Sequence, residues 1–133
     1  MFDRLTRHFG APARALMALI FILSGIGKIS AFSVTQEYME AYGLPGFLLV
    51  PTIAFEIGAG LLLLVGIATR YIAFLLAGFC IVSALIFHRD IGDQIQQIMF
   101  LKNLTMAGGF LLLAKVGARG LSLDSLLASR RGA

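Results

Sequence analysis

Charge is scarce in this chain. Only 14% of its 133 residues are Asp, Glu, Lys or Arg, whereas a soluble domain of this size carries about a quarter. Hydrophobic residues make up 59%, and the mean hydropathy is +0.91. This balance excludes an ordinary water-soluble domain and predicts a protein embedded in the lipid bilayer. The formal net charge of +4 comes from basic residues that flank apolar runs, which indicates membrane orientation and no nucleic-acid partner.

Residues that carry redox and metal chemistry are also scarce. The chain has one cysteine, Cys80, and two histidines, His8 and His88. Thiol–disulfide exchange needs paired cysteines, and a haem held in a helical bundle needs axial ligands at membrane depth. The ligand set is too small for an ordinary metal site, and no nucleotide loop or serine-nucleophile motif is present. We therefore predict no metal and no covalently bound cofactor.

Long apolar runs, by contrast, are abundant. They are continuous and do not alternate, and an open sheet cannot lie in lipid, so strands are excluded. Four runs are long enough to cross hydrocarbon as helices, at about 13–30, 47–68, 71–87 and 98–117, with a tight turn at Thr69–Arg70. The predicted fold is all-α: a single membrane domain over residues 1–133, built as an integral membrane four-helix antiparallel bundle with short interfacial helices.

Two short helices are expected outside the four spans. Ser33 followed by Gln36 resembles a capping box, which predicts a helix on the outer surface. At the other end, Ser122 is placed to cap a helix over Leu123–Arg131, within a cytoplasmic interfacial tail at 118–133.

Basic residues are distributed unevenly between the two ends of the predicted helices. Eight lie on the side of the termini and three on the other side. The eight are Arg4, Arg7, Arg14, Arg70, Lys115, Arg119, Arg130 and Arg131, and the three are Lys28, Arg89 and Lys102. By the positive-inside tendency, both termini are predicted to be cytoplasmic.

One acid interrupts the second apolar run. Glu56 is the tenth of the twenty residues from Phe47 to Gly66, and it is the one ionisable group among them. A charge at this depth costs roughly 2.5–3.5 kcal/mol, so it needs a partner, a proton or a water-filled pocket. Thr52, Glu56 and Gly60 share a helical face of small residues, which points Glu56 into the bundle. A purely structural ion pair and a role in a site both remain open.

Other polar residues gather towards the outer ends of the helices. On the first helix, Ser24 and Lys28 share a face, and Gly25 and Gly27 allow a neighbouring helix to approach. Lys28 either extends to the headgroups or joins Glu56, which lies about 12 Å below the outer end of its helix.

The third and fourth helices contribute three further candidates. His88 closes the third run and is either a boundary residue or part of a site, while Lys102 and Asn103 open the membrane part of the fourth. Asn103 is suited either to interhelical packing or to a ligand carbonyl. Because the helices alternate in direction, we expect these three side chains to share one outer polar pocket with Lys28 and Glu56.

The order of several short motifs resembles the DoxX family of small four-helix bacterial membrane proteins. They are FILSGIGKIS (Phe21–Ser30), EYMEAYGLP (Glu37–Pro45), FEIGAGLLLLVGIATR (Phe55–Arg70), FLKNLTMAGGFLLLA (Phe100–Ala114) and LSLD near the end. The resemblance runs from about Leu16 to Asp124. It implies a location in the bacterial inner membrane, and a shared polar set of Lys28, Glu56, His88, Lys102 and Asn103. The family name comes from a link with a quinone-reducing thiosulfate oxidoreductase, and some relatives are associated with thiol and oxidative-stress partners.

Three functions remain open at this point. The first is an accessory subunit of a membrane redox system that binds a quinone or another small amphiphile and works with a soluble or membrane oxidoreductase. There Lys28, Lys102, His88 and Asn103 hydrogen-bond the ligand and Glu56 tunes or supplies protons. The second is a small proton-coupled transporter that uses Glu56. The third is a structural docking partner without a ligand. Whether a reaction is catalysed, and whether the chain forms a homo-oligomer, stays open.

Overall fold

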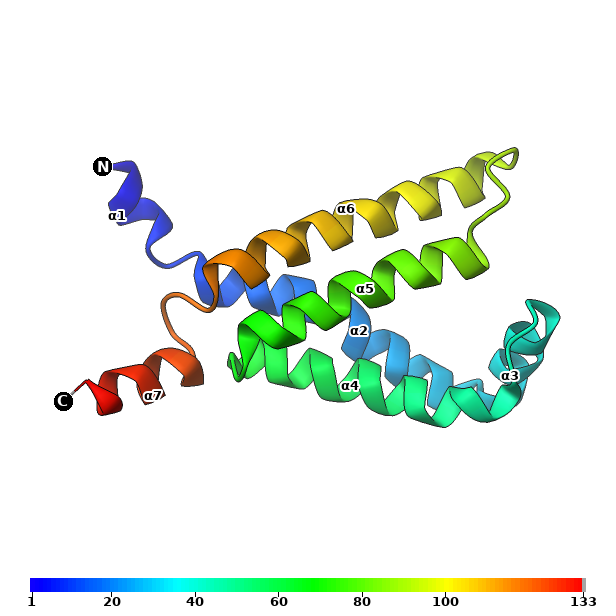
Figure 1. The fold of residues 1–133 in the computed structure, drawn as a ribbon, viewed down its shortest axis with the longest axis horizontal. Coiled ribbons are helices and arrows are strands. Elements are labelled where there is room, and N and C mark those ends of the chain that lie inside the picture. The colour runs from blue at the N-terminus through cyan, green and yellow to red at the C-terminus, as the bar shows by residue number, and fades with distance from the viewer. Residues whose placement is uncertain (133) are drawn as a thin grey trace. The chain divides into compact units, whose positions relative to one another are not determined.

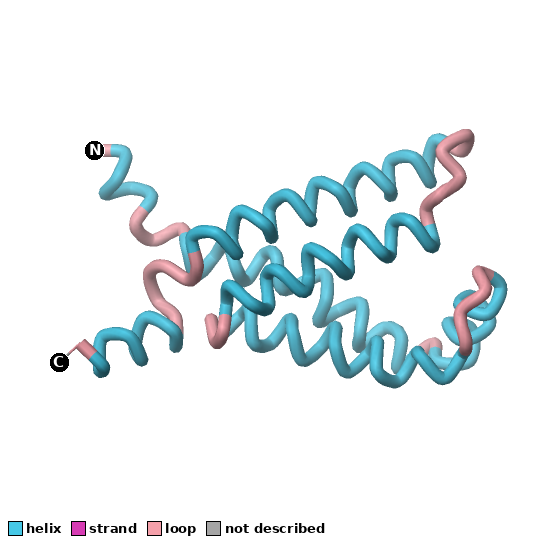
Figure 2. The backbone as a smooth tube through the Cα atoms, viewed as in Figure 1, coloured by secondary structure: helices cyan, strands magenta, loops and turns pink. Residues whose placement is uncertain are grey.

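The computed structural model describes residues 1–132, and these contain helices and loops but no strand (Figures 1 and 2). In chain order the elements are α1 (Phe2–Thr6), α2 (Gly10–Ser30), α3 (Phe32–Ala41), the 3-10 turn η1 (Gly46–Leu48), α4 (Leu49–Val65), α5 (Thr69–Phe87), α6 (Gln94–Val116) and α7 (Leu123–Arg131). Four of them are long and apolar enough to cross a membrane: Gly10–Ser30, Gly46–Val65, Thr69–Phe87 and Gln94–Val116. The prediction of an all-α membrane protein is confirmed.

The helices form two compact units. One contains residues 1–68 together with the C-terminal segment from Ala118, and the other contains Thr69–Gly117. In the first unit α2 packs against α4, and in the second α5 packs against α6. Both pairs are antiparallel. In the first, Lys28 near the end of α2 contacts Glu56, whereas Gly60, further along α4, packs against Ile22, earlier in α2. In the second, Arg70 at the start of α5 donates to the Ala114 carbonyl near the end of α6.

Helix boundaries differ from the predicted ones for local reasons. The first span begins at Gly10 and not near residue 13, because Pro12 lies in the first turn, where a helix has no use for the missing N–H. The turn predicted at Thr69–Arg70 is wrong. Helix α4 ends at Val65, the next residue Gly66 adopts a left-handed conformation with φ 76°, and α5 already begins at Thr69.

One of the two predicted caps is confirmed. The Ser122 side chain accepts a hydrogen bond from the Ser125 backbone N–H at 3.1 Å, and α7 follows as expected. Ser33 does not cap α3, which begins one residue earlier without a side-chain cap. Gln36 instead donates from Nε2 to the Gly46 carbonyl at 3.2 Å, so it ties α3 to η1. The short helix α1 was not predicted.

Candidate functional site

Two glycines allow α2 and α4 to pack closely. A Cβ added at Gly25 of α2 would lie 2.5 Å from Ile57 Cγ1, and one added at Gly60 of α4 would lie 2.7 Å from Ile22 Cγ1. Neither position has room for a side chain, as expected for small residues at a membrane helix interface. Gly27 has nothing within 4 Å of an added Cβ, so its predicted part in this contact is wrong.

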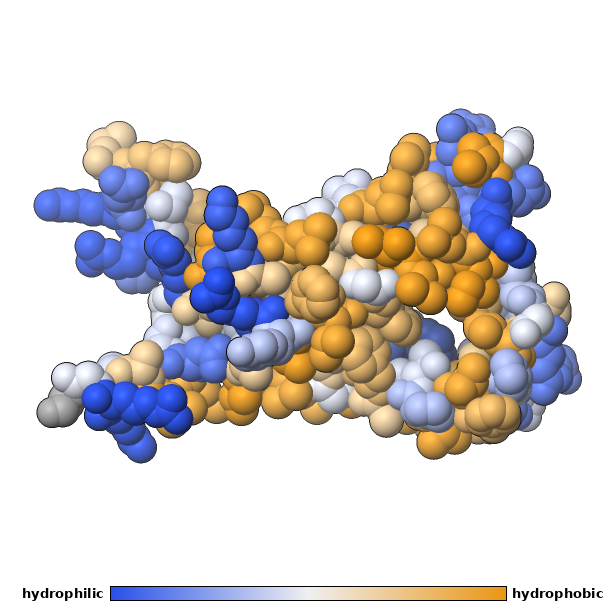
Figure 3. Space-filling view, in the orientation of Figure 1, coloured by the Kyte–Doolittle hydropathy of each residue, from blue (hydrophilic) through white to orange (hydrophobic). Residues whose placement is uncertain are grey.

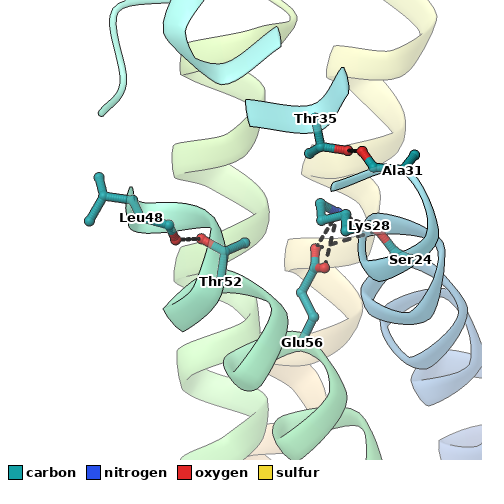
Figure 4. Close-up of polar contacts among 7 residues, drawn as sticks. All are labelled: Ser24, Lys28, Ala31, Thr35, Leu48, Thr52 and Glu56. Atoms are coloured by element: carbon teal, nitrogen blue, oxygen red, sulfur yellow. Dashed lines mark hydrogen bonds and ion pairs between the residues drawn. The ribbon is translucent and has the colours of Figure 1, made fainter. Parts of the chain in front are cut away.

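The close approach brings Lys28, Glu56 and Ser24 together. Lys28 Nζ lies 2.9 Å from Oε2 and 3.0 Å from Oε1 of Glu56, and it donates to Ser24 Oγ at 2.6 Å (Figure 4). Ser24 Oγ also donates to Glu56 Oε1 at 3.5 Å. An ammonium has three N–H donors, and these three contacts use all of them. The intramembrane carboxylate therefore has a counter-ion and a hydroxyl donor on α2.

The two ends of the ion pair differ in exposure. The Glu56 side chain is 4% exposed, whereas that of Lys28 is 25% exposed. A buried carboxylate depends on its partner, because an unpaired charge in a low-dielectric medium is costly. The lysine side chain, in contrast, is a quarter exposed, so part of it lies at the surface. Lys28 is thus the more accessible member of the pair.

Neighbouring threonines do not take part in the ion pair. Thr52 lies one turn from Glu56 on α4, but its hydroxyl donates to the Leu48 carbonyl at 2.7 Å (Figure 4). Thr35 of α3 makes the same kind of bond to Ala31, also at 2.7 Å. Such bonds to the carbonyl four residues earlier satisfy a hydroxyl inside an apolar helix. The pair is therefore the polar centre of this helix contact.

The remaining predicted residues belong to the second unit. His88 Nδ1 lies 2.9 Å from Gln96 Oε1, which links the end of α5 to the start of α6. The donor and acceptor roles of the two ring nitrogens depend on the tautomer of the imidazole. Within residues 1–132, Lys102 is exposed and Asn103 is half-buried, and neither makes a side-chain hydrogen bond or ion pair.

The structure thus joins part of the predicted polar set. Ser24, Lys28 and Glu56 form one cluster, and His88 is joined to Gln96, which sequence reasoning did not select as its partner. The sequence signal for this contact is the spacing, because Gln96 lies eight residues after His88, inside the helix that follows it. The single outer pocket that also includes Lys102 and Asn103 stays a prediction. The described residues hold no group of three metal-ligating side chains.

Comparison with known proteins places these residues in a family. Residues 11–89 match the family model described as DoxX. The chain is 48% identical over 115 residues to the inner membrane protein YqjF of Escherichia coli (strain K12), which covers 86% of this chain and 88% of the relative. It is 39% identical over 119 residues to the inner membrane protein YphA of the same organism, covering 84% and 85%.

A more distant match carries a different kind of name. The chain is 31% identical over 64 residues to the Bacillus subtilis (strain 168) protein named "Putative oxidoreductase CatD", a segment that covers 48% of each chain. No solved structure matches the chain.

Proposed function

The chain belongs to the DoxX family of integral membrane proteins, and we propose that it binds a quinone or a similar small amphiphile at the Lys28–Glu56 pair. In this proposal it is an accessory subunit of a membrane redox system. One observation carries the idea: in this helix contact the side chain of Lys28 is 25% exposed, whereas that of Glu56 is 4% exposed. A structural ion pair has no need of an accessible end, whereas a binding site does.

The residues at the pair fit a ligand with carbonyl oxygens. Lys28 offers charged N–H donors and Ser24 offers a hydroxyl, and the helix faces around them are apolar. A carbonyl oxygen that accepts a bond from Lys28 replaces one of its present bonds to Ser24 or Glu56. Glu56 still holds a second, charge-assisted bond to the ammonium during this exchange. Charged donors of this kind are worth about 1.5–3 kcal/mol per hydrogen bond.

The redox setting rests on the names of relatives. A relative that matches about half of this chain is called an oxidoreductase. This chain has one cysteine and two histidines, so in our proposal it binds the ligand while a soluble or membrane oxidoreductase partner supplies the electrons. His88, Lys102 and Asn103 belong to the second unit, and a single variant of each measures whether it also affects ligand binding.

Thermal stabilisation by a ligand tests the proposal directly. Purified protein is heated with increasing decylubiquinone, and decylbenzene serves as a match for the tail without the carbonyls. A true ligand at one hundred times its Kd stabilises the fold by about 2.7 kcal/mol. We expect Lys28→Met to weaken binding about tenfold or more. Thr52→Val, one turn away, is expected to bind normally. Equal stabilisation by both compounds would reject a quinone site.

The closed geometry of the pair favours a second candidate, a structural docking protein. All three ammonium donors are already used within the chain. Here Lys28→Met combined with Glu56→Leu should preserve copurification with a partner and that partner's activity, since a buried ion pair can be replaced by packed apolar side chains. Under the quinone proposal the same double variant keeps its fold and loses the ligand. Measurements on this one double variant therefore distinguish the docking function from quinone binding. Proton flux in liposomes that stops in Glu56→Gln would instead support transport.

We also propose that both termini face the cytoplasm of a bacterial inner membrane. Eight basic residues lie at the end of the spans that carries the termini and three at the other end, and this bias sets orientation. The inner-membrane names of two relatives support the location.

A further inference from the structure

A buried arginine fixes the C-terminal segment to the first unit. Arg14, in the second turn of α2, is 2% exposed, and its Nη2 donates to the Leu121 carbonyl at 2.5 Å. Its Nε and Nη1 have no hydrogen-bond partner within residues 1–132. Such a burial is costly, and the bond to the Leu121 carbonyl offsets part of that cost. The Asp124 carboxylate is close enough to interact electrostatically with Arg14.

Asp124 holds the same segment from a second side. Its backbone N–H donates to the Gly66 carbonyl at 2.8 Å, and its Oδ1 accepts from the Ala68 N–H at 2.9 Å. In the turn after α4, Asp124 therefore pairs one backbone carbonyl and one backbone N–H. Ser122, 4% exposed, caps α7 directly beside this link. The start of α7 is fixed to the end of the α2–α4 pair.

The N-terminal segment is packed against the same place. A Cβ added at Gly10 would overlap the Arg119 carbonyl oxygen, and one added at Gly120 would lie 3.4 Å from the Arg7 carbonyl oxygen. The connection from α1 to α2 thus contacts the connection from α6 to α7. The end of α1 and the start of α7 therefore lie next to each other, at the same end of the α2–α4 pair.

The two anchored helices expose apolar and basic side chains together. On α7, Leu123, Leu126 and Leu127 are 40–52% exposed, and the helix closes with Arg130 and Arg131. On α1, Phe2 and Leu5 are exposed beside Arg4. Figure 3 shows hydrophilic side chains next to apolar ones at both chain ends. A short helix of this composition at the end of a membrane span is suited to the headgroup region.

We propose that α1 and α7 form a binding surface for anionic phospholipid headgroups, with phosphatidylglycerol as the ligand class. Leucines enter the acyl boundary, and arginines Arg4, Arg7, Arg119, Arg130 and Arg131 contact the phosphates. These segments contain five arginines and two acids, Asp3 and Asp124. Asp124 is already bonded to the turn after α4. Clusters of four to eight basic residues beside a membrane span bind anionic lipid. The bonds made by Arg14 and Asp124 hold the start of α7 in a fixed position relative to α2 and α4.

The test follows α7 in the full chain. Cys80 is replaced by Ala, Leu127→Cys carries a bimane fluorophore, and the solubilised protein is titrated with short-chain phosphatidylglycerol or with the matched phosphatidylcholine. We expect a blue shift of emission with phosphatidylglycerol at concentrations where phosphatidylcholine has little effect, and weaker binding at raised salt. Each surface basic residue contributes about fivefold to affinity, so Arg130→Gln with Arg131→Gln should lose more than tenfold. Inorganic phosphate in large excess should not displace the lipid.

Two variants serve as comparisons. Arg89→Gln, in the connection between α5 and α6, removes a basic residue that is not part of this surface and should bind normally. Asp124→Ala keeps every arginine but frees α7, so the lipid-induced shift should shrink. Equal responses to both lipids, or an unchanged affinity in the double arginine variant, would overturn the proposal. An unchanged shift in Asp124→Ala would overturn the anchoring part. Displacement by phosphate would replace a lipid site with a general anion site.

Discussion

Lys28 Nζ lies nearly equidistant from the two carboxylate oxygens of Glu56, at 2.9 and 3.0 Å. One ammonium near the end of α2 thus neutralises a carboxylate in the middle of α4. The contact explains how an acid is tolerated inside an apolar run, because its charge is paired and hydrogen-bonded where water is absent. Because its two residues come from α2 and α4, the pair also depends on how these two helices are packed.

The unequal burial of the pair predicts unequal effects of breaking it. Lys28→Met leaves Glu56, 4% exposed, without its counter-ion, and we expect a loss of about 3 kcal/mol in the free energy of unfolding. Glu56→Gln leaves a lysine that is 25% exposed and can turn to the surface, so we expect a loss of about 1 kcal/mol. Thermal unfolding of the purified protein in detergent measures both.

The double variant provides the check on this interpretation. Lys28→Met with Glu56→Leu removes both charges together, so it should unfold near the unchanged protein. Equal losses in the two single variants, or a double variant that unfolds as readily as Lys28→Met, would contradict a burial effect.

Glycines of α2 provide a matched pair for the helix contact. Gly25→Ala places a Cβ 2.5 Å from Ile57 Cγ1 and should cost about 1–3 kcal/mol through overpacking, with weaker quinone binding because the ion pair moves. Gly27→Ala, two residues along the same helix, meets nothing within 4 Å and should stabilise by about 0.5 kcal/mol. Unfolding temperatures that do not separate the two would mean that α2 and α4 pack differently.

The turn after α4 offers a test of backbone conformation. Gly66 has φ 76°, and a Cβ there would lie 2.5 Å from Ser122 Cβ, so Gly66→Ala should cost about 2 kcal/mol or more. Ala68 also has positive φ, at 49°, with a side chain already present. Ala68→Gly should therefore leave stability unchanged or raise it by up to about 1 kcal/mol. The comparison is made by thermal unfolding, and similar losses in both variants would argue against this turn.

Much of the fold follows from the sequence because lipid leaves the backbone few options. An apolar run of about twenty residues has to satisfy its own N–H and C=O groups, and a helix does this. Pairing of Glu56 was one of the expected solutions for the same reason, since an acid in that run needs a partner, a proton or a water-filled pocket. Lys28 was within reach from the outer end of α2, and the structure places it there.

Other features depend on three-dimensional register, which no local pattern contains. Gly25 and Gly27 look alike in the sequence, and only the rotation of α2 decides that Gly25 faces α4. Arg14 reads as one more flanking basic residue, yet it is buried because a segment over a hundred residues later supplies the Leu121 carbonyl. Ser33 and Gln36 match the capping-box pattern, but Ser33 does not cap α3 and the Gln36 side chain donates to the Gly46 carbonyl on η1.

The last prediction concerns the orientation of the protein in the membrane, which labelling of introduced cysteines can measure. In a Cys80→Ala background, Ile91→Cys lies in the connection between α5 and α6, and Ser129→Cys lies on α7; both positions are exposed. The excess of basic residues near the termini predicts that a membrane-impermeant maleimide labels Ile91→Cys in intact inner-membrane spheroplasts, and labels Ser129→Cys only after the membrane is opened. The unlabelled Cys80→Ala protein sets the background. Because four spans return the chain to its starting side, labelling of Ser129→Cys in closed spheroplasts would reverse the whole topology. It would then move the Lys28–Glu56 pair to the cytoplasmic half of the membrane.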